Sequence, residues 1–325
     1  MMVGAHPVVL TFLANFLIEH GYKPSESLRA YDGPTIFDPD TIGTVPAKSV
    51  FHALNESVRH TGDPNLVLNF AKWLDVRAFG PIAILYEFCP NLGYVFNRAK
   101  QFLPIVNSAY PFDVILVDEE AHVIQSVLPS LASDADQFLF STQVFIVRLI
   151  RQIFGSQWKP LRVEMSHQFA GDNRLLQSFF RCPIEITPGH NSILLDSYDL
   201  ARNFPRHDRG MLTYLEADTK KLLSRIPGSF DMQVERFVAS GLGFGKATLK
   251  DTAANFRISV RTLQRALENS GTNFSNILNK VRRETCDAYF RNSSKASVSE
   301  LTYILGYSDI STTSRFLANA QVRRG

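Results

Sequence analysis

The sequence predicts two domains: an α+β N-terminal domain, and an all-α C-terminal domain with two helix-turn-helix units joined by a long helix. The chain has 325 residues, 45% of them apolar, which is enough for about two domains. Strand-like and helical spacings mix up to residue 225, and beyond it the spacing is helical only. Residues from 228 carry 14 Lys and Arg against 8 Asp and Glu, whereas the preceding residues carry 20 against 23. The basic part therefore favours a polyanionic partner, with a solvated basic face as the alternative.

The N-terminal domain is expected to span residues 1–225. Apolar residues at helical spacing predict helices over residues 7–20, 46–60, from 63 onward and 135–154, and residues 218–225 are predicted to close a further helix. β-rich runs predict strands over residues 112–117, 122–128, 161–169, 184–187 and 191–195. Residues 226–230 contain Pro-Gly-Ser and are predicted to be a linker, so the C-terminal domain spans residues 231–325.

Composition excludes several classes of protein. No apolar run approaches the ~18 residues that span a bilayer. The strongest run, residues 8–18, carries Asn15 and follows no basic segment, so it does not resemble a secretory signal. Three scattered cysteines favour neither a disulfide framework nor a zinc site. We therefore expect a cytoplasmic protein without a membrane segment, a metal or a cofactor.

Isolated reactive residues are assigned to structure. Cys182 lies among apolar residues and is interpreted as a buried thiol in a strand rather than a nucleophile. His167 and His190 could line a ligand pocket, but core or turn roles are favoured. The acidic residues beside His122 lack metal-ligand spacing and are interpreted as a solvated hairpin turn: Asp113, Asp118, Glu119 and Glu120. No catalytic residues are assigned, and no enzyme is expected.

The segment from Thr248 to Asn269 is the most informative. A short helix over residues 248–256 and a tight turn over 257–259 precede a helix over 260–268 that Ser259 caps. Leu263 and Leu267 face inward, which leaves four polar side chains on or near the outer face: Arg261, Thr262, Gln264 and Arg265. This is a helix-turn-helix pattern, whose second helix lies in the major groove. Arg suits guanine and Gln suits adenine, so base reading is predicted, with an ordinary helical hairpin as the alternative.

A second unit follows about 50 residues later. Ser297 caps a helix, residues 306–309 form the turn, and residues 310–320 form the second helix. A long helix over residues 273–290 joins the two units. The sequence therefore predicts two recognition helices on one support.

These segments resemble the AraC/XylS transcriptional regulators. The matching segments, in order, are "ISVRTLQRAL", "GTNFSNILNKVRRETCDAYF" and "SVSELTYILGYSDISTTSRF". The N-terminal domain is similar to the effector domain of the subgroup typified by ornithine-utilisation regulators, through "VPAKSVFHALNESVRHTGDPNL", "VEMSHQF", "FFRCPIEITPGHNSILLD" and "LARNFPRHD". The resemblance implies an activator or repressor that binds promoter DNA, usually as a homodimer, under the control of a small molecule. RNA polymerase is a further candidate partner.

The resemblance also assigns residue roles. Base reading falls to Arg261, Gln264 and Arg265 in the first unit, and in the second to Ser311, Thr312, Ser314 and Arg315. The second unit departs from the family pattern, because Thr313 replaces a bulky apolar residue and the usual aromatic-basic pattern and closing helix are missing. We expect the second unit to be poorly packed and the first half-site to be the more restrictive.

An arginine-rich segment, "ARNFPRHDRG", is the predicted effector site. It carries Arg202, Arg206 and Arg209, and arginine binds phosphate bidentately and stacks on bases. The spacing of the first two resembles the RxxxR motif of PilZ domains, which bind cyclic di-GMP, although the second motif of those domains is absent. Cyclic di-GMP is therefore the first effector named, followed by an amino acid or other small metabolite. A basic surface loop is the alternative.

The leading interpretation is a sequence-specific DNA-binding transcriptional regulator controlled by a small-molecule effector through dimerisation. A ligand-sensing interaction protein that has lost DNA binding is the second interpretation, and an enzyme with a basic accessory domain is the third.

Overall fold

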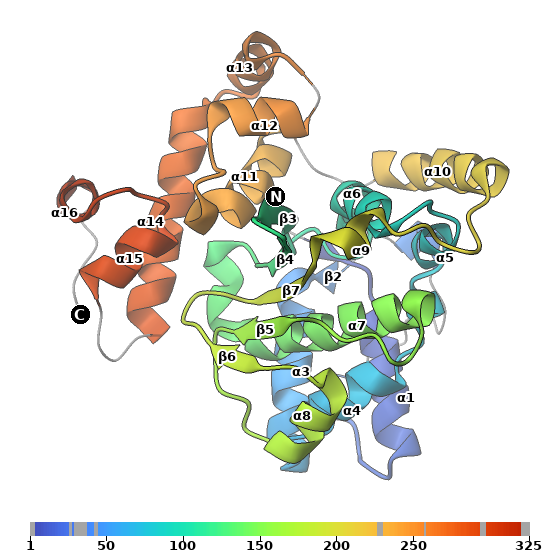
Figure 1. The fold of residues 1–325 in the computed structure, drawn as a ribbon. Coiled ribbons are helices and arrows are strands. Elements are labelled where there is room, and N and C mark those ends of the chain that lie inside the picture. Colours follow the sequence, from blue (N-terminus) through green and yellow to red (C-terminus); the bar gives the residue numbers. More distant parts are fainter. Residues whose placement is uncertain are drawn as a thin grey trace. The chain divides into compact units, whose positions relative to one another are not determined.

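The computed structural model in Figure 1 describes most of the chain: residues 4–25, 28, 38–41, 45–225, 230–256, 258–292 and 297–319. The chain divides into two compact units. The first unit comprises residues 1–125 and 134–226, and the second comprises residues 126–133 and 227–325. Residues 226–229 of the predicted linker lie outside the described residues, as do Arg257 of the first predicted turn and residues 320–325.

The first unit combines helices and strands, which confirms the predicted α+β class. Its helices are α1 (Val8–Glu19), α3 (Ala47–Thr61), α4 (Leu66–Trp73), α5 (Pro81–Glu87), α6 (Leu92–Phe102), α7 (Asp136–Phe154), α8 (Asn173–Phe180), α9 (Ser197–Ala201) and α10 (Arg209–Ser224). Helix α7 packs against α3 and α4 through an apolar face on which Val144, Val147 and Ile150 are fully buried. This 3.6-residue periodicity is what predicts α7 from the sequence.

A five-stranded sheet lies in the first unit, in the order β3-β4-β7-β5-β6. Its strands are β3 (Phe112–Val117), β4 (Glu120–Gln125), β5 (Arg162–Met165), β6 (Ile184–Ile186) and β7 (Ser192–Asp196). The β5–β6 pair is parallel and the other pairs are antiparallel. Two short strands, β1 (Gly4–Ala5) and β2 (Val45–Pro46), form a separate antiparallel pair.

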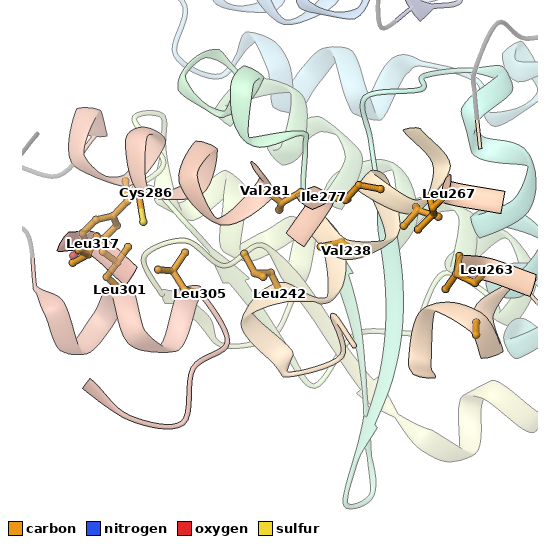
Figure 2. Packing of buried hydrophobic residues seen from close by; sticks show 13 residues of the cluster. Val238, Leu242, Leu263, Leu267, Ile277, Val281, Cys286, Leu301, Leu305 and Leu317 are labelled. Atoms are coloured by element: carbon orange, nitrogen blue, oxygen red, sulfur yellow. The ribbon is translucent and has the colours of Figure 1, made fainter. Parts of the chain in front are cut away.

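The second unit confirms the predicted helical domain. Its helices are α11 (Phe230–Gly241), α12 (Leu249–Asn255), α13 (Val260–Asn269), α14 (Phe274–Asn292), α15 (Val298–Ile304) and α16 (Ile310–Asn319). Figure 2 shows one continuous row of apolar side chains, which runs from Leu263 and Leu267 through Val281 to Leu305 and Leu317. The two helix-turn-helix units therefore share a single hydrophobic core, and each one supports the other.

Some element boundaries differ from the predicted ones. The helix that residues 218–225 were expected to close ends at Ser224 and begins at Arg209, because the Asp208 side chain accepts the Met211 N–H at 2.8 Å and starts the helix there. Helix α8 was not predicted, because it has only eight residues, of which two are buried, and so offers few apolar positions to a sequence pattern. Phe256 follows α12 instead of ending it. None of the described helices is long and apolar enough to cross a membrane.

Candidate DNA-binding surface and effector cavity

The first helix-turn-helix unit has a side-chain cap on each helix. The Thr248 hydroxyl accepts the Asp251 N–H at 3.0 Å and donates to Asp251 Oδ2 at 2.5 Å, which starts α12. The Ser259 hydroxyl accepts the Thr262 N–H at 3.1 Å and starts α13, as predicted. The Thr262 hydroxyl lies 2.8 Å from Ser259 Oγ, so the cap holds this side chain at the beginning of the helix. These caps satisfy N–H groups that a helix end leaves without partners.

Helix α13 presents a polar face to solvent. Leu263 and Leu267 are fully buried on its inner side. Arg261, Gln264 and Arg265 follow i, i+3, i+4 spacing on the opposite side, and all three are exposed. Within the described part of the chain, no hydrogen bond or ion pair engages any of these three side chains. Their donors and acceptors are therefore free to meet an external partner.

Helix α16, the predicted second recognition helix, has two of its three predicted base-reading hydroxyls, those of Ser311 and Thr312, already engaged. Asp309 Oδ1 accepts the Ser311 hydroxyl at 2.6 Å and the Thr312 N–H at 2.8 Å, while its Oδ2 accepts the Thr312 hydroxyl at 2.8 Å. Arg315 in turn donates to the Thr312 hydroxyl at 3.2 Å, and Ser314 is exposed. The hydrogen bond from Ser311, with those from Thr312, lowers the pKa of Asp309 to about 2. A carboxylate therefore stands at the start of α16, where α13 has a neutral serine.

The second helix-turn-helix unit is well packed, contrary to the expectation from its divergent residues. Thr313 is fully buried, and so are Leu301 of the neighbouring α15 and Leu305, which follows that helix. Leu317 is also buried and belongs to the shared core. A threonine fits here because its hydroxyl reaches the Asp309 carbonyl oxygen of the preceding turn, at 3.4 Å.

Helix α14 and Gly306 fix the second helix-turn-helix unit against the rest of the C-terminal domain. The Arg282 guanidinium of α14 lies over the Tyr307 ring at 3.9 Å, and its Nε donates to the Leu305 carbonyl at 3.2 Å. Gly306 has a φ of +66° and lies directly against the backbone of Leu242, in the 3₁₀ turn Leu242–Phe244. The turn of the second unit is therefore held from both sides.

The N-terminal compact unit contains an apolar cavity of about 130 Å³. Its walls come from α1, α3, α4, α5, α6, α7 and the segments beside them. The aromatic residues that line it are Phe70, Phe79, Tyr86, Phe96, Tyr110, Phe112, Phe138 and Phe145. An engineered apolar cavity of about 150 Å³ takes up benzene, so this cavity has room for a small organic molecule.

Two tyrosine hydroxyls are buried beside the cavity. Within the described residues, Tyr86 Oη makes no hydrogen bond, whereas the Tyr110 hydroxyl interacts with the hydroxyl of Thr142. Tyr110 lies beside Thr142, whose hydroxyl donates to Gln125 at 2.6 Å. Burial raises the pKa of both tyrosines above the ordinary value, so both hydroxyls stay neutral. His6 also lines the cavity, but its Nδ1 already accepts the N–H of Val8 at 3.1 Å.

Comparison with known proteins identifies the family. Residues 36–204, more than half of the chain, match the model of the arabinose-binding domain of AraC transcription regulators, N-terminal. The chain belongs to the AraC family of transcription regulators. The HTH-type transcriptional regulator VqsM of Pseudomonas aeruginosa is 22% identical over 255 residues, which cover 74% of this chain and 76% of VqsM. The AraC resemblance predicted from the sequence is confirmed, as is the prediction of a regulator rather than an enzyme.

A solved structure supports the fold of this AraC-family chain. The crystal structure of transcriptional regulator CdpR from Pseudomonas aeruginosa superposes with a TM-score of 0.52 at 14% sequence identity. The superposition covers 97% of this chain and 96% of that one. The α+β unit followed by a helical unit is therefore an architecture that a crystal structure of a regulator also has.

The arginines predicted to hold the effector lie on the surface of the AraC-type domain. The Arg202 guanidinium lies over the Phe154 ring at 4.6 Å, and Arg206 Nη1 is 3.3 Å from Glu87 Oε2. Arg209 begins α10 and is exposed. None of the three lines the cavity, and Arg202 and Arg206 contact different helices, α7 and α5. Sequence reasoning did not predict the cavity, because its walls come from many separate segments.

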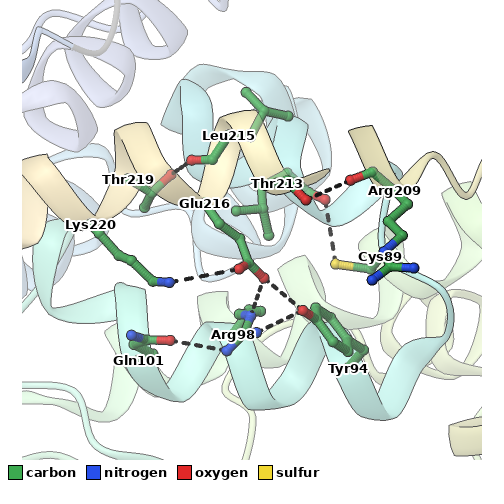
Figure 3. A network of polar contacts seen from close by, with 11 residues as sticks. Cys89, Tyr94, Arg98, Gln101, Arg209, Thr213, Leu215, Glu216, Thr219 and Lys220 are labelled. Carbon is green, nitrogen blue, oxygen red and sulfur yellow. Dashed lines mark hydrogen bonds and ion pairs between the residues drawn. The ribbon is translucent and has the colours of Figure 1, made fainter. Parts of the chain in front are cut away.

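Helix α10, the last helix of the effector domain, is fastened to α6 by the network in Figure 3. The Tyr94 hydroxyl donates to Glu216 Oε1 at 2.7 Å, and Arg98 Nε donates to the same oxygen at 2.5 Å. Lys220 Nζ lies 3.9 Å from Glu216 Oε2. Arg98 and Glu216 are largely buried, so this ion pair is partly shielded from solvent. The other side of α6 lines the cavity through Val95, Phe96 and Ala99.

The remaining reactive residues have structural surroundings. Cys182 is buried just before β6 rather than within a strand, and burial raises its pKa to about 11, so it stays a thiol. His167 Nδ1 lies 3.5 Å from Asp136 Oδ1, and His190 is buried in the turn before β7; neither lines the cavity. Among the described residues, no cluster of His, Cys, Asp and Glu could hold a metal ion.

The acidic group near the β3–β4 hairpin is divided between core and turn. Asp118 and Glu119 form an exposed two-residue turn, in which Asp118 has a φ of +53°. Asp113 instead is buried and forms an ion pair with Lys100 of α6. The prediction that it belongs to a solvated turn is wrong, because Asp113 lies near the start of β3, away from the turn, where both Phe112 and Asp113 are buried.

Proposed function

We propose that this chain is a sequence-specific DNA-binding regulator whose α13 reads bases in the major groove. The observation that carries the proposal is the outer face of α13, where Arg261, Gln264 and Arg265 are exposed and make no side-chain hydrogen bond or ion pair with the residues that the structure describes. Arg pairs bidentately with guanine, and Gln with adenine, so this face has the donors and acceptors that base reading needs. The basic balance of the C-terminal part supplies attraction to phosphates.

The two recognition helices meet the same DNA site. Helix α14 joins the units and one hydrophobic core holds them, so α13 and α16 enter successive major grooves on one face of the duplex. The first half-site carries most of the sequence preference, because the Ser311 and Thr312 hydroxyls of α16 are bound to Asp309. Phosphate contacts position both helices and carry no sequence information.

The N-terminal domain controls DNA binding through an effector and a homodimer. A ligand that binds one state of the protein better shifts the population toward that state, and by linkage it changes DNA affinity by the same factor as DNA changes ligand affinity. Promoter DNA, the effector and a second copy of the chain are the partners, with RNA polymerase as a candidate fourth.

Selection of genomic DNA fragments by the full-length protein tests this function. The selected fragments are expected to share a motif, and affinity for that motif is expected to fall linearly on logarithmic axes as salt rises. Scrambled fragments of the same length and composition serve as the control. Equal affinity for both sets would favour a ligand-sensing interaction protein that has lost DNA binding.

Replacing Asp309 by asparagine is expected to tighten DNA binding by about two- to threefold, because one negative charge near the phosphates is removed. Asparagine caps a helix as well as aspartate does, so α16 should keep its start. Asp172→Asn is the matched control, since Asp172 also caps a helix but lies in the N-terminal compact unit. Fluorescence anisotropy with the selected fragment measures both variants. Weaker DNA binding by Asp309→Asn would show that the Asp309 carboxylate helps the second helix-turn-helix unit to bind DNA.

Cyclic di-GMP at the arginine segment stays a prediction. The contacts of Arg202 with Phe154, and of Arg206 with Glu87, weigh against it, since a nucleotide would have to displace them. Calorimetry with cyclic di-GMP on the intact protein and on the Arg202→Ala, Arg206→Ala double variant is the test. A heat of binding that the intact protein gives and the double variant does not would assign the effector site to this segment.

A further inference from the structure

Three large apolar side chains are exposed among the described residues of the C-terminal domain: Val260, Tyr303 and Ile310. Two of them occupy equivalent places, because Val260 is the first residue of α13 and Ile310 is the first residue of α16. Their exposed fractions are 37% and 51%. A single exposed apolar residue is ordinary, but one at the first position of both proposed recognition helices requires an explanation.

Packing of the domain does not explain these two side chains. The supporting helices α12 and α15 also begin with an apolar residue, Leu249 and Val298, but both of these are half-buried. The described part of the shared core includes Leu249, and it includes Ile258, which precedes the cap of α13 and supplies the usual apolar contact there. Neither Val260 nor Ile310 belongs to that core. Their apolar surface is therefore available to an external partner.

Both side chains lie next to positions that are predicted to read bases. Val260 is four residues before Gln264, and Ile310 is four residues before Ser314, so each pair lies on neighbouring turns of one side of its helix. A recognition helix brings its N-terminal residues to the base edges in the major groove. The apolar group that DNA presents there is the C5-methyl group of thymine, which apolar side chains contact.

We propose that Val260 and Ile310 each contact the C5-methyl group of a thymine and are specificity-determining residues of the two recognition helices. The proposal rests on the proposed function, since it adds an apolar base contact to the polar ones. Four residues of a helix rise about 6 Å and one base pair about 3.4 Å. The thymine that Val260 contacts therefore lies within about two base pairs of the adenine that Gln264 reads.

The methyl contact matters most in the second half-site. Asp309 engages the Ser311 and Thr312 hydroxyls, which reduces polar base reading by α16. A contact between Ile310 and a methyl group needs neither a donor nor an acceptor, so Asp309 does not weaken it. One thymine is therefore expected to account for most of the preference that this half-site retains.

Replacement of thymine by uracil tests the contact, because uracil lacks the methyl group and keeps every hydrogen-bonding group. Each thymine of the selected genomic site is replaced in turn, and fluorescence anisotropy measures the affinity of the full-length protein. We expect one thymine in each half-site at which uracil weakens binding about three- to fourfold, as burial of one methyl group predicts. A half-site without such a thymine would overturn the assignment of the residue on its helix.

Two alanine variants assign each methyl contact to its side chain. Val260→Ala is expected to bind thymine and uracil equally in the first half-site and to keep the preference for thymine in the second, and Ile310→Ala is expected to do the reverse. Each variant is thus the control for the other, and both should unfold at the temperature of the natural chain because the two residues are exposed. A thymine preference that survives in both half-sites would overturn the assignment. Weaker binding with an unchanged response to uracil would place the side chain against the sugar-phosphate backbone and would also overturn it.

One further comparison separates this proposal from the proposed function. If the chain selects a shared motif and Arg265→Ala weakens binding to it, while no uracil replacement has an effect, the proposed function holds and the methyl contacts are wrong. If the chain selects no shared motif, the proposed function is wrong and the methyl contacts fail with it.

Discussion

Gly306→Ala is expected to destabilise the C-terminal unit by about 4 kcal/mol or more. Gly306 has a φ of +66°, which side chains adopt only with strain, and a Cβ there would collide with the Leu242 carbonyl oxygen. Because the obstacle is backbone, no rotamer change relieves it. The turn must move away from Leu242, which opens the core shared by the two helix-turn-helix units (Figure 2). Hydrogen exchange of α11 to α16 during urea unfolding measures the loss.

Gly271→Ala is the matched control for this substitution. Gly271 also has a positive φ, +75°, but an added Cβ would meet nothing within 4 Å. It should lose only the strain of the left-handed conformation, about 1–2 kcal/mol. If the two variants lower the free energy of unfolding by the same amount, the contact between Gly306 and Leu242 does not hold the second helix-turn-helix unit in place.

Arg265→Ala is expected to weaken binding to the selected DNA site by about 2 kcal/mol, roughly 30-fold. Arg265 is exposed on the outer face of α13, beside Arg261 and Gln264, and its side chain has no hydrogen-bond or ion-pair partner among the described residues. Stability should therefore stay unchanged while specificity relaxes at one or two base pairs. Anisotropy titrations with the site and with each single-base variant measure both effects.

Arg174→Ala is the control for loss of a positive charge. Arg174 is 92% exposed and lies in the first unit, in α8. This variant should bind the site as the natural chain does. If Arg265→Ala weakens the affinity for the site and for every single-base variant by the same factor, Arg265 contacts a phosphate. If the affinity is unchanged, Arg265 lies outside the interface.

The helix-turn-helix units could be predicted from the sequence because their signals are local. Ser259 before a helix, and Leu263 with Leu267 four residues apart, are an N-cap and an apolar face that a short window contains. The β3–β4 hairpin was predicted for the same reason, since its strands adjoin one short turn. Local patterns therefore led to the predicted fold class.

The cavity could not be predicted, because it depends on packing between distant segments. Tyr86 and Tyr110 are ordinary aromatic residues of apolar runs in the sequence, and only the fold brings them to one space. The arginine segment was singled out because charge is visible in a sequence and an apolar void is not. The engagement of Ser311 and Thr312 by Asp309 also needed atomic geometry, since a serine-rich helix start suits base reading equally well.

Base-resolution footprinting of the full-length protein on its selected genomic site tests the central claim most directly. The account predicts two protected major-groove segments on one face of the DNA, about one helical turn apart. The segment contacted by α13 should tolerate fewer base changes than the segment contacted by α16. Protection of a single segment, or a site in which the α16 segment is the more restrictive, would contradict the account.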